Sequence, residues 1–171
     1  MLPLKNLSII ALAVSLLSAG DMTVARDLRF FLANNCAGSF LICSSLPKGR
    51  CCSTGTPFAS ERLTDESGLS ILVGFGAEDC LNTAPATFLT GPGCVAGSFA
   101  LFSGRWNGDG SRIAAAEAGP EDCATPDGFG YTDESGTVAF QGKFTEKNKE
   151  AVLAAFTGEK KVSLDSLKSL A

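Results

Sequence analysis

The fold is decided by the stretch Ser39-Phe-Leu-Ile-Cys-Ser-Ser-Leu-Pro-Lys-Gly-Arg-Cys-Cys52, which joins an apolar strand candidate, a turn and two adjacent cysteines. A disulfide between adjacent cysteines is strained, because the chain holds their Cα atoms about 3.8 Å apart, below the usual range for a disulfide. We therefore predict that Cys51 and Cys52 bond to different partners and pin this turn between two parts of the fold.

Cysteines recur on both sides of this stretch, at Cys36, Cys43, Cys51, Cys52, Cys80, Cys94 and Cys123. In an oxidising compartment such a series forms disulfides, each of which stabilises a fold by roughly 2 to 4 kcal/mol. We predict at least two intramolecular disulfides, and favour three. Seven is an odd number, and we choose Cys123 as the unpaired thiol. An inert thiol in a monomer is favoured, with a disulfide-linked dimer or a modified or reactive thiol as alternatives.

The N-terminus has the parts of a signal peptide. Lys5 precedes the apolar run 7–17, and small residues lead to Gly20. The run is shorter than the roughly 20 residues that a membrane span needs. We predict that residues 1–20 are removed, with cleavage after Ala25 as the alternative, and that the protein is secreted, extracellular and without a membrane span.

The middle of the chain is typical of short strands separated by turns. The strand candidates are Leu28–Leu32, Ser39–Cys43, Leu69–Phe75 and Ser98–Phe102. The turns between them are predicted at residues 47–49, 54–57, 65–68 and 90–93, which contain Gly or Pro. The spacing indicates an antiparallel β-sandwich over residues 28–106. Its expected core residues are Phe31, Phe40, Ile42, Leu72, Phe99 and Leu101.

The C-terminal part of the chain has a different composition and a different pattern of predicted elements. Residues 107–130 are predicted to be irregular, with at most one helical turn at Ile113–Ala118, and 136–142 is a strand candidate. We expect Thr145 to cap a helix over 146–156, which presents an apolar stripe and ends at Gly158, and Ser163 to cap a second over 164–170. The stripe consists of Val152, Leu153 and Phe156. We thus divide the chain into a stapled β-domain, 21–123, and a β-α extension, 124–171, that docks on it or on a partner.

Four segments carry a resemblance to a known group. They are Asn35-Cys-Ala-Gly-Ser-Phe-Leu-Ile-Cys43, Leu46-Pro-Lys-Gly-Arg-Cys-Cys52, Gly74-Phe-Gly-Ala-Glu-Asp-Cys80 and Gly93-Cys-Val-Ala-Gly-Ser-Phe-Ala-Leu-Phe-Ser-Gly-Arg-Trp106. Together they resemble small secreted cysteine-rich proteins of fungi with a βγ-crystallin-like, killer-toxin-like fold. The resemblance covers about half the chain and implies a mainly β, Greek-key β-sandwich. Toxins, antimicrobial proteins and plant-pathogen effectors share this fold, and it implies no single activity.

Two candidate sites follow from these segments. Many crystallin-type domains bind calcium through a loop rich in Asn, Asp and Ser, because oxygen ligands suit this cation. Asn34, Asn35 and Ser39 are the calcium candidates here, but Gly38 stands where a hydroxyl ligand is needed, so an Asn-rich turn is favoured. As a guess for a binding surface we select Arg105 and Trp106, although half-buried core is the favoured position for the tryptophan.

Composition narrows the function. The chain has no histidine, so sites that need this residue for acid–base, nucleophilic or zinc chemistry are excluded. Loss of Lys5 with the leader leaves 13 cationic and 18 acidic side chains, a net charge of about −5, which argues against nucleic acid as a partner. A glycosidase needs two carboxyl groups about 5 to 9.5 Å apart. The candidate acids are the pairs Glu78-Asp79, Glu121-Asp122 and Asp133-Glu134.

Each of these acids lies next to its partner in the sequence, and neighbours on an extended strand point to opposite faces, so we interpret them as solvated turn acids. We select no catalytic residue and no cofactor. The favoured function is a non-enzymatic secreted cysteine-rich protein, an effector or antimicrobial toxin, that binds an unknown extracellular, host, competitor or cell-surface target. The alternatives are a small secreted carboxylate-based glycoside hydrolase and an extracellular calcium-binding crystallin-type domain.

Overall fold

The structure is a computed structural model that describes residues 24–64, 70–81, 85–91, 93–108, 123–158 and 162–171. The predicted leader, the alanine stretch Ile113–Ala118 and the acid pair Glu121-Asp122 lie outside the described residues. The elements are β1 (Ala25–Phe31), β2 (Gly38–Pro47), β3 (Cys51–Leu63), β4 (Ile71–Phe75), the 3₁₀ turn η1 (Glu78–Cys80), β5 (Ala86–Thr90), β6 (Cys94–Asn107), β7 (Gly128–Thr132), β8 (Val138–Lys143), α1 (Lys149–Thr157) and α2 (Leu164–Ser169).

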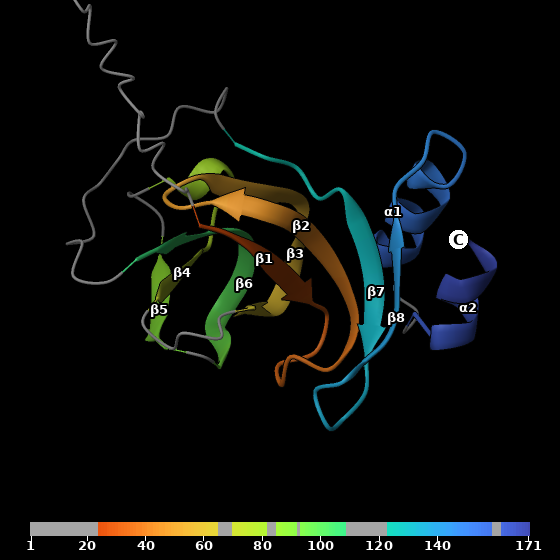
Figure 1. Cartoon of the computed structure of the whole chain (residues 1–171), viewed down its shortest axis with the longest axis horizontal. Helices are drawn as coiled ribbons and strands as arrows, with labels where there is room; N and C mark the ends of the chain where they lie inside the picture. Colours follow the sequence, from red (N-terminus) through yellow and green to blue (C-terminus); the bar gives the residue numbers. More distant parts are fainter. Residues whose placement is uncertain (1–23, 65–69, 82–84, 92, 109–122, 159–161) are drawn as a thin grey trace, which may run out of the picture.

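The strands form one antiparallel sheet in the order β5-β4-β6-β3-β1-β2-β7-β8. β4 and β5 lie at one side of the molecule, and β7, β8 and both helices lie at the other (Figure 1). Beyond the named strands, the N–H of Ala124 donates to the carbonyl of Cys51, and the N–H of Ser53 donates to the carbonyl of Ala124, each at 2.8 Å. The prediction of a mainly β, antiparallel and disulfide-stapled fold is confirmed.

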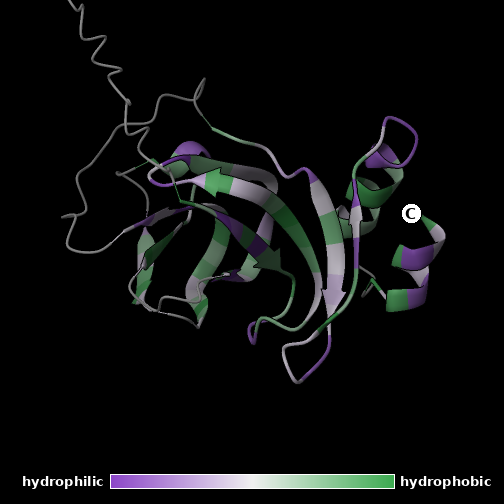
Figure 2. Ribbon diagram, viewed as in Figure 1, coloured by the Kyte–Doolittle hydropathy of each residue, from purple (hydrophilic) through white to green (hydrophobic). Residues whose placement is uncertain are grey.

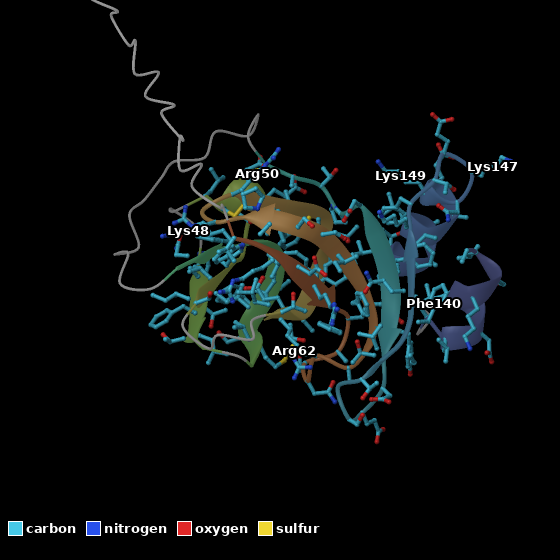
Figure 3. All side chains as sticks on the ribbon, in the orientation of Figure 1. Lys48, Arg50, Arg62, Phe140, Lys147 and Lys149 are labelled. Atoms are coloured by element: carbon cyan, nitrogen blue, oxygen red, sulfur yellow. A yellow bond between two sulfur atoms is a disulfide. The ribbon has the colours of Figure 1, made fainter. Side chains whose placement is uncertain are left out.

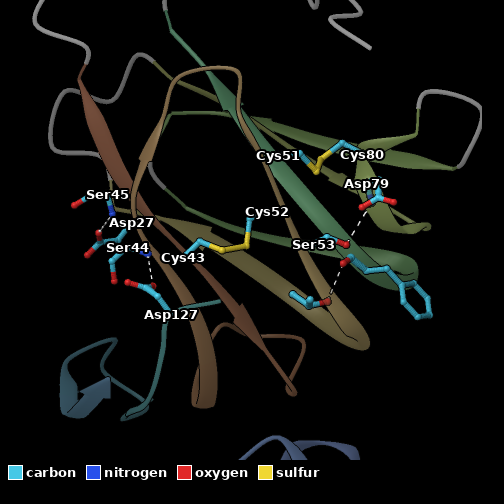
Figure 4. Close-up of a disulfide and its surroundings, with 12 residues drawn as sticks. Asp27, Cys43, Ser44, Ser45, Cys51, Cys52, Ser53, Asp79, Cys80 and Asp127 are labelled. Atoms are coloured by element: carbon cyan, nitrogen blue, oxygen red, sulfur yellow. Dashed lines mark hydrogen bonds between the residues drawn. A yellow bond between two sulfur atoms is a disulfide. The ribbon is translucent and has the colours of Figure 1, made fainter. Parts of the chain in front are cut away.

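Three disulfides hold the sheet, and their Cα–Cα distances of 5.7 to 6.4 Å lie in the usual range. The pairs are Cys36–Cys94, Cys43–Cys52 and Cys51–Cys80. Adjacent residues of a strand point to opposite faces, so Cys51 reaches η1 while Cys52 reaches β2 (Figure 4). Both the number of bridges and the separate partners of the adjacent pair are as predicted, and Cys123 is in none of the three. Such a framework is compatible with an extracellular protein.

One predicted turn, residues 54–57, is wrong. These residues lie inside β3, which runs over 13 residues. The register with β6 shifts between Ser53 and Phe58, so the segment is an irregularity in a continuous strand. Gly55 adopts the positive φ that this shift requires, at +68°, and Pro57 sits where no regular ladder bond is needed. Glycine and proline thus mark a bulge here.

The predicted turn before the cysteine pair is correct, since Gly49 has φ +78° and the N–H of Arg50 donates to the carbonyl of Pro47.

Three strands were not predicted. Besides β3, β5 was missed, and β7 falls in the segment that was expected to be irregular. The composition of β7, Gly-Phe-Gly-Tyr-Thr, conceals it because glycine is rare in strands. Packing explains the glycines: an added Cβ at Gly128 would lie 2.6 Å from the carbonyl oxygen of Gly142, and one at Gly130 would collide with the ring of Phe40.

The predicted core is confirmed at Phe31, Phe40, Ile42, Leu72 and Leu101, which are all buried, and is wrong at one position. Phe99 is only partly buried, because the register with β3 is irregular along this part of β6. Hydrophobic residues lie along the strands and on both helices (Figure 2). The largest buried cluster combines residues from β1, β2, β3, β4, β6 and β7 with Val152, Phe156, Val162 and Leu167 of the C-terminal part.

Strands β7 and β8 of the C-terminal extension continue the sheet beside β2, and its helical part is docked on the sheet, as predicted. Thr145 and Asn148 cap the turn before α1 reciprocally: Thr145 N–H donates to Asn148 Oδ1 at 2.7 Å, and Asn148 N–H donates to Thr145 Oγ1 at 3.2 Å. Regular helix consequently begins at Lys149 rather than 146. Ser163 caps α2 by accepting from Ser166 N–H at 3.1 Å. In the described part of the chain, no helix is long and apolar enough to cross a membrane.

Replacing Phe156 with Ala is expected to weaken the docking of α1 by about 3 to 5 kcal/mol. The ring is 4% exposed and its centroid lies 6.1 Å from that of Phe58 in β3. The β-sheet should stay folded, because no disulfide reaches the extension. Limited proteolysis should cut the variant around residues 142–150 sooner than the unmodified protein, with Lys147→Ala, an exposed change, as control. Equally rapid cleavage there in the unmodified protein would show a free tail.

Candidate functional site

A pocket of about 400 Å³ lies where β2 begins and β7 ends, and we call it the β2–β7 pocket. It forms because the two strands pair in antiparallel register, with Gly38 opposite Thr132 and Ser39 opposite Tyr131. The loop between β1 and β2 and the segment before α2 complete the walls. The lining residues are Leu32, Ala33, Asn35, Ala37, Gly38, Ser39, Tyr131, Thr132, Glu134 and Val162.

The walls of this pocket are held by specific contacts. Ser39 is 5% exposed, and its hydroxyl donates to the carbonyl of Val162 at 2.6 Å, which ties the segment before α2 to β2. Gly38 adopts φ +84°, a conformation that glycine tolerates best. The pocket therefore joins residues that are more than 120 positions apart in the sequence.

Thr132 is the buried polar residue of the pocket. Its side chain is 1% exposed, and its hydroxyl has no hydrogen-bond partner within the described protein. Most buried polar groups in native proteins are hydrogen-bonded, and a buried group without a partner costs about 1 to 3 kcal/mol. The hydroxyl oxygen is itself buried, so a ligand that enters the pocket does not reach it in this conformation.

The two acids of the pair Asp133-Glu134 have different roles. The Asp133 carboxylate accepts from the N–H of Ser135 and of Thr137, each at 2.9 Å, and from the Ser135 hydroxyl at 2.6 Å. These bonds, first of all that of the Ser135 hydroxyl, hold the pKa of Asp133 below its usual value. Asp133 thus shapes the β7–β8 turn, while exposed Glu134 borders the β2–β7 pocket.

A second pocket of about 320 Å³, which we call the η1 pocket, contains the acid pair Glu78-Asp79. These acids were interpreted as turn acids, and they lie in a 3₁₀ turn, where Asp79 has φ +59°. In this turn both acids border the same pocket. Cys123 and Lys149 line it as well.

Cationic side chains are spread over the molecule rather than gathered. Lys48 and Arg50 lie by the β2–β3 turn, Arg62 lies at a different side, and Lys147 and Lys149 lie by the start of α1 (Figure 3). Of these five, Lys149 lines the η1 pocket and none lines the β2–β7 pocket. The charge that borders the β2–β7 pocket in the described part of the chain is therefore the carboxylate of Glu134.

Comparison with known protein families gives one match, a model of an N-terminal domain that covers residues 27–127. The chain belongs to the ARB_05566_N family. No curated protein and no solved structure matches it. The ARB_05566_N segment contains all seven cysteines, β1 from Asp27 onward and the strands β2–β6, whereas β7, β8, α1 and α2 lie beyond it.

The two ends of the ARB_05566_N segment meet at β2. Asp27 accepts from the N–H of Ser45 at 2.9 Å, and Asp127 accepts from the N–H of Ser44 at 2.7 Å (Figure 4). Ser45 has φ +50°, which is uncommon for a residue other than glycine. The two carboxylates thus accept the backbone N–H groups at an irregular point in β2. They also bring the two ends of the matched segment close together.

The calcium candidates lie close together in sequence but do not form a ligand cage. Asn34 and Asn35 are exposed, and Asn35 lines the β2–β7 pocket. The Ser39 hydroxyl points to Val162, as described above. Calcium takes six to eight oxygen ligands, commonly with several carboxylates. Among the described residues, no group of three or more His, Cys, Asp or Glu side chains could hold a metal ion.

Arg105 and Trp106, the suggested binding surface, are 1% and 2% exposed. The indole Nε1 donates to the carbonyl of Leu46 at 2.8 Å, and the Arg26 guanidinium lies 4.8 Å from the indole ring centroid. The Arg105 guanidinium lies 5.2 Å from the centroid of Phe75, and burial lowers its pKa. The structure thus places both residues inside the fold, where they support packing, because aromatic rings attract guanidinium groups when water is excluded.

Sequence reasoning missed Glu61. This β3 residue is fully buried, neither carboxyl oxygen has a hydrogen-bond partner in the described protein, and burial raises the pKa of the carboxyl well above its usual value. Gly74 and Gly104, which pair across β4 and β6, make room for it. A Cβ at Gly74 would lie 2.6 Å from Oε1, and one at Gly104 would collide with Oε2. Glycine inside a strand often marks such a close approach. The two glycines were therefore the sequence feature that could have indicated a buried side chain here.

Proposed function

We propose that the chain is a secreted, disulfide-stapled protein that binds an extracellular target without catalysing a reaction. The target lies on a host or a competitor, and the role is that of an effector or an antimicrobial toxin. The βγ-crystallin-like Greek-key relationship belongs to the same proposal, as does the fungal group that the cysteine segments resemble. Secretion is supported by the leader-like N-terminus and by the three disulfides.

The observation that carries the proposal is the β2–β7 pocket, whose walls come from three separate segments of the chain. The strands, the Ser39–Val162 bond and the Asp133 turn hold the walls in place before any ligand arrives. A site organised in advance loses less conformational entropy on binding, so it binds more tightly.

Catalysis has less support from the arrangement of the acids. A carboxylate pair that cleaves a glycosidic bond faces the substrate from two sides of a groove. Neither pocket described above receives carboxylates from two separate segments: Glu134 borders one, and the adjacent Glu78 and Asp79 border the other. The η1 pocket still favours a hydrolase as the second candidate, because both acids of one pair reach it.

The experiment compares binding with hydrolysis on the same material. Purified secreted protein is mixed with isolated plant and fungal cell walls, and both the bound protein and the released reducing sugar are measured. We expect saturable binding to one of the two materials and no release of sugar. Glu78→Gln, Asp79→Asn and heat-denatured, reduced protein are the controls.

Sugar release that Glu78→Gln or Asp79→Asn abolishes would overturn the proposal in favour of the hydrolase. Absence of saturable binding to either material would also contradict it. Infiltration of the protein into plant tissue, beside a growth assay on competitor cultures, then separates the effector role from the antimicrobial role.

A further inference from the structure

We propose that the chain forms a two-fold dimer in which strand β5 pairs with the β5 strand of a second copy. This dimer goes beyond the proposed function, because it concerns how the protein associates with itself whichever target it binds. β5 is the outermost strand at one side of the sheet, and among the described strands it pairs with β4 alone (Figure 1). One side of its backbone therefore offers hydrogen-bonding groups to a further strand.

The backbone groups that β5 leaves open follow from its hydrogen bonds to β4. Just beyond one end of β5, the N–H of Gly91 donates to the carbonyl of Ser70 at 2.8 Å. Just before the other end, the N–H of Gly76 donates to the carbonyl of Pro85, also at 2.8 Å. Bonded and non-bonded pairs alternate along antiparallel strands. The residues of β5 whose N–H and carbonyl groups point away from β4 are consequently Ala86, Phe88 and Thr90.

These open positions are complementary to themselves. When two β5 strands run antiparallel about Phe88, this residue lies opposite its own counterpart, and Ala86 of each copy lies opposite Thr90 of the other. Each of these pairs can exchange both backbone bonds, because none of the three residues is a proline. The same surface is used on both copies, so the contact is isologous and closes as a dimer.

The side chain at the centre of this edge favours the same pairing. Phe88 is 66% exposed, the largest value among the exposed large hydrophobic residues of the described chain. It lies opposite Val73 of β4, which is buried in a small cluster with Phe75 and the Cys51–Cys80 bridge. Side chains at directly opposite positions of an antiparallel pair are in contact. Pairing about Phe88 therefore brings two exposed rings together and extends one small cluster into that of the second copy.

Charge permits a second copy at this edge and opposes one at the other edge of the sheet. The chain has a net negative charge, so two copies repel each other on average. No charged residue occurs from Leu81 to Gly104, a range that contains β5. The opposite edge strand, β8, ends in exposed Lys143, and lysine on an edge strand is a common guard against pairing. We therefore expect β5 to pair with β5 rather than with β8, which would give an open chain of copies.

The length of the contact limits its strength. β5 has five residues, which span about 17 Å. A contact of this length is small beside the roughly 1,200 Å² that stable protein–protein interfaces bury. We expect a reversible dimer with a dissociation constant of about 10 µM to 1 mM.

The test is sedimentation velocity of the purified, disulfide-bonded protein over about 5 µM to 1 mM, a range that brackets this dissociation constant. The sedimentation coefficient should rise with concentration from that of a monomer toward that of a dimer. Phe88→Lys removes the central ring and sets two like charges opposite each other, so it should weaken association at least about tenfold. Thr90→Lys is a second variant on the same edge. Ala139→Lys, an exposed change in β8, is the matched control and should leave association unchanged.

Hydrogen exchange at individual amides identifies the edge directly. The amides of Thr87 and Leu89 bond to β4 in the monomer, so their exchange should be slow at every concentration. Exchange at Phe88 and Thr90 should slow as the concentration rises, because these N–H groups become bonded only in the dimer.

Each other outcome contradicts the proposal. A protein that stays monomeric at every concentration would overturn it, even if an extended peptide slows exchange at Phe88 instead. A dimer that neither lysine variant in β5 weakens would place the interface elsewhere. Growth beyond the dimer would overturn the two-fold closure, and a dimer that persists on a non-reducing denaturing gel would be linked through Cys123 instead. The cell-wall assay decides separately whether the proposed function stands.

Discussion

Replacing Glu61 with Gln is expected to make the folded protein more stable at neutral pH and to leave its stability unchanged at low pH. The carboxyl is fully buried, and burial raises its pKa well above 4.5. At low pH it is protonated in the folded and the unfolded chain alike, and it then resembles the glutamine amide. As the pH rises above about 4.3, the unfolded chain releases this proton while the folded chain keeps it.

The sign follows from that difference in bound protons. Because the unfolded chain binds fewer protons, the free energy of unfolding falls by about 1.4 kcal/mol for each pH unit, until the pH reaches the raised pKa of the folded state. The glutamine variant lacks this loss. Burial is the cause of the raised pKa, and the neighbouring strand β4 carries no charged residue.

Urea unfolding at several pH values between about 4 and 8 measures the effect. The quantity of interest is the difference in the free energy of unfolding between the variant and the unmodified protein, which should grow with pH. Glu134→Gln is the matched control, because that carboxylate is exposed. A difference that is independent of pH for Glu61→Gln would show that the buried carboxyl does not titrate as described.

The disulfide framework could be anticipated from the sequence because it depends on residues that are neighbours in the chain. Adjacent cysteines cannot easily bond to one another, and alternation along a strand sends Cys51 and Cys52 to opposite faces. The helices were anticipated for the same reason: Thr145, Gly158 and Ser163 act on backbone groups within one turn. The pairing of the cysteines was left open, because it depends on which strands become neighbours.

The long strand β3 and the glycine-rich strand β7 were missed because their glycine and proline residues were assigned the role that these residues usually have in sequences. Gly55 and Pro57 usually end a strand, but here they form a bulge in one. Gly128 and Gly130 usually weaken a strand, but here they admit neighbouring groups that a side chain would exclude. Both cases depend on a partner strand that lies far away in the sequence.

The candidate site was only partly visible for the same reason. Asn35 and Ser39 were selected as calcium ligands, and they do border the β2–β7 pocket. Thr132 carried no signal by itself, since its burial follows from its position opposite Gly38 in the register of β2 and β7. A pocket assembled from three separated segments cannot be read from the spacing within any one of them.

Replacing Gly104 with Ala is expected to destabilise the fold by about 1 to 3 kcal/mol, the usual cost of overpacking a core. The new methyl group would collide with Oε2 of Glu61 and would lie 3.1 Å from Cδ2 of Leu28. Neither neighbour is free to retreat, because both side chains are fully buried in β3 and β1. The free energy of unfolding in urea measures the loss.

The source of this loss is identified by a double-mutant cycle with Glu61→Ala. If the collision with the carboxyl group dominates, Glu61→Ala removes it, and the double variant is more stable than the sum of the two single effects by about 0.5 to 3 kcal/mol. In the control cycle, Gly142→Ala in β8 takes the place of Gly104→Ala, because its added Cβ would meet the rings of Phe129 and Phe140 rather than Glu61. The effects of Gly142→Ala and Glu61→Ala on the free energy of unfolding should be additive within about 0.5 kcal/mol. Additive behaviour of Gly104→Ala with Glu61→Ala would instead place the cost of the methyl group at Leu28, and the glycine would not be there for the acid.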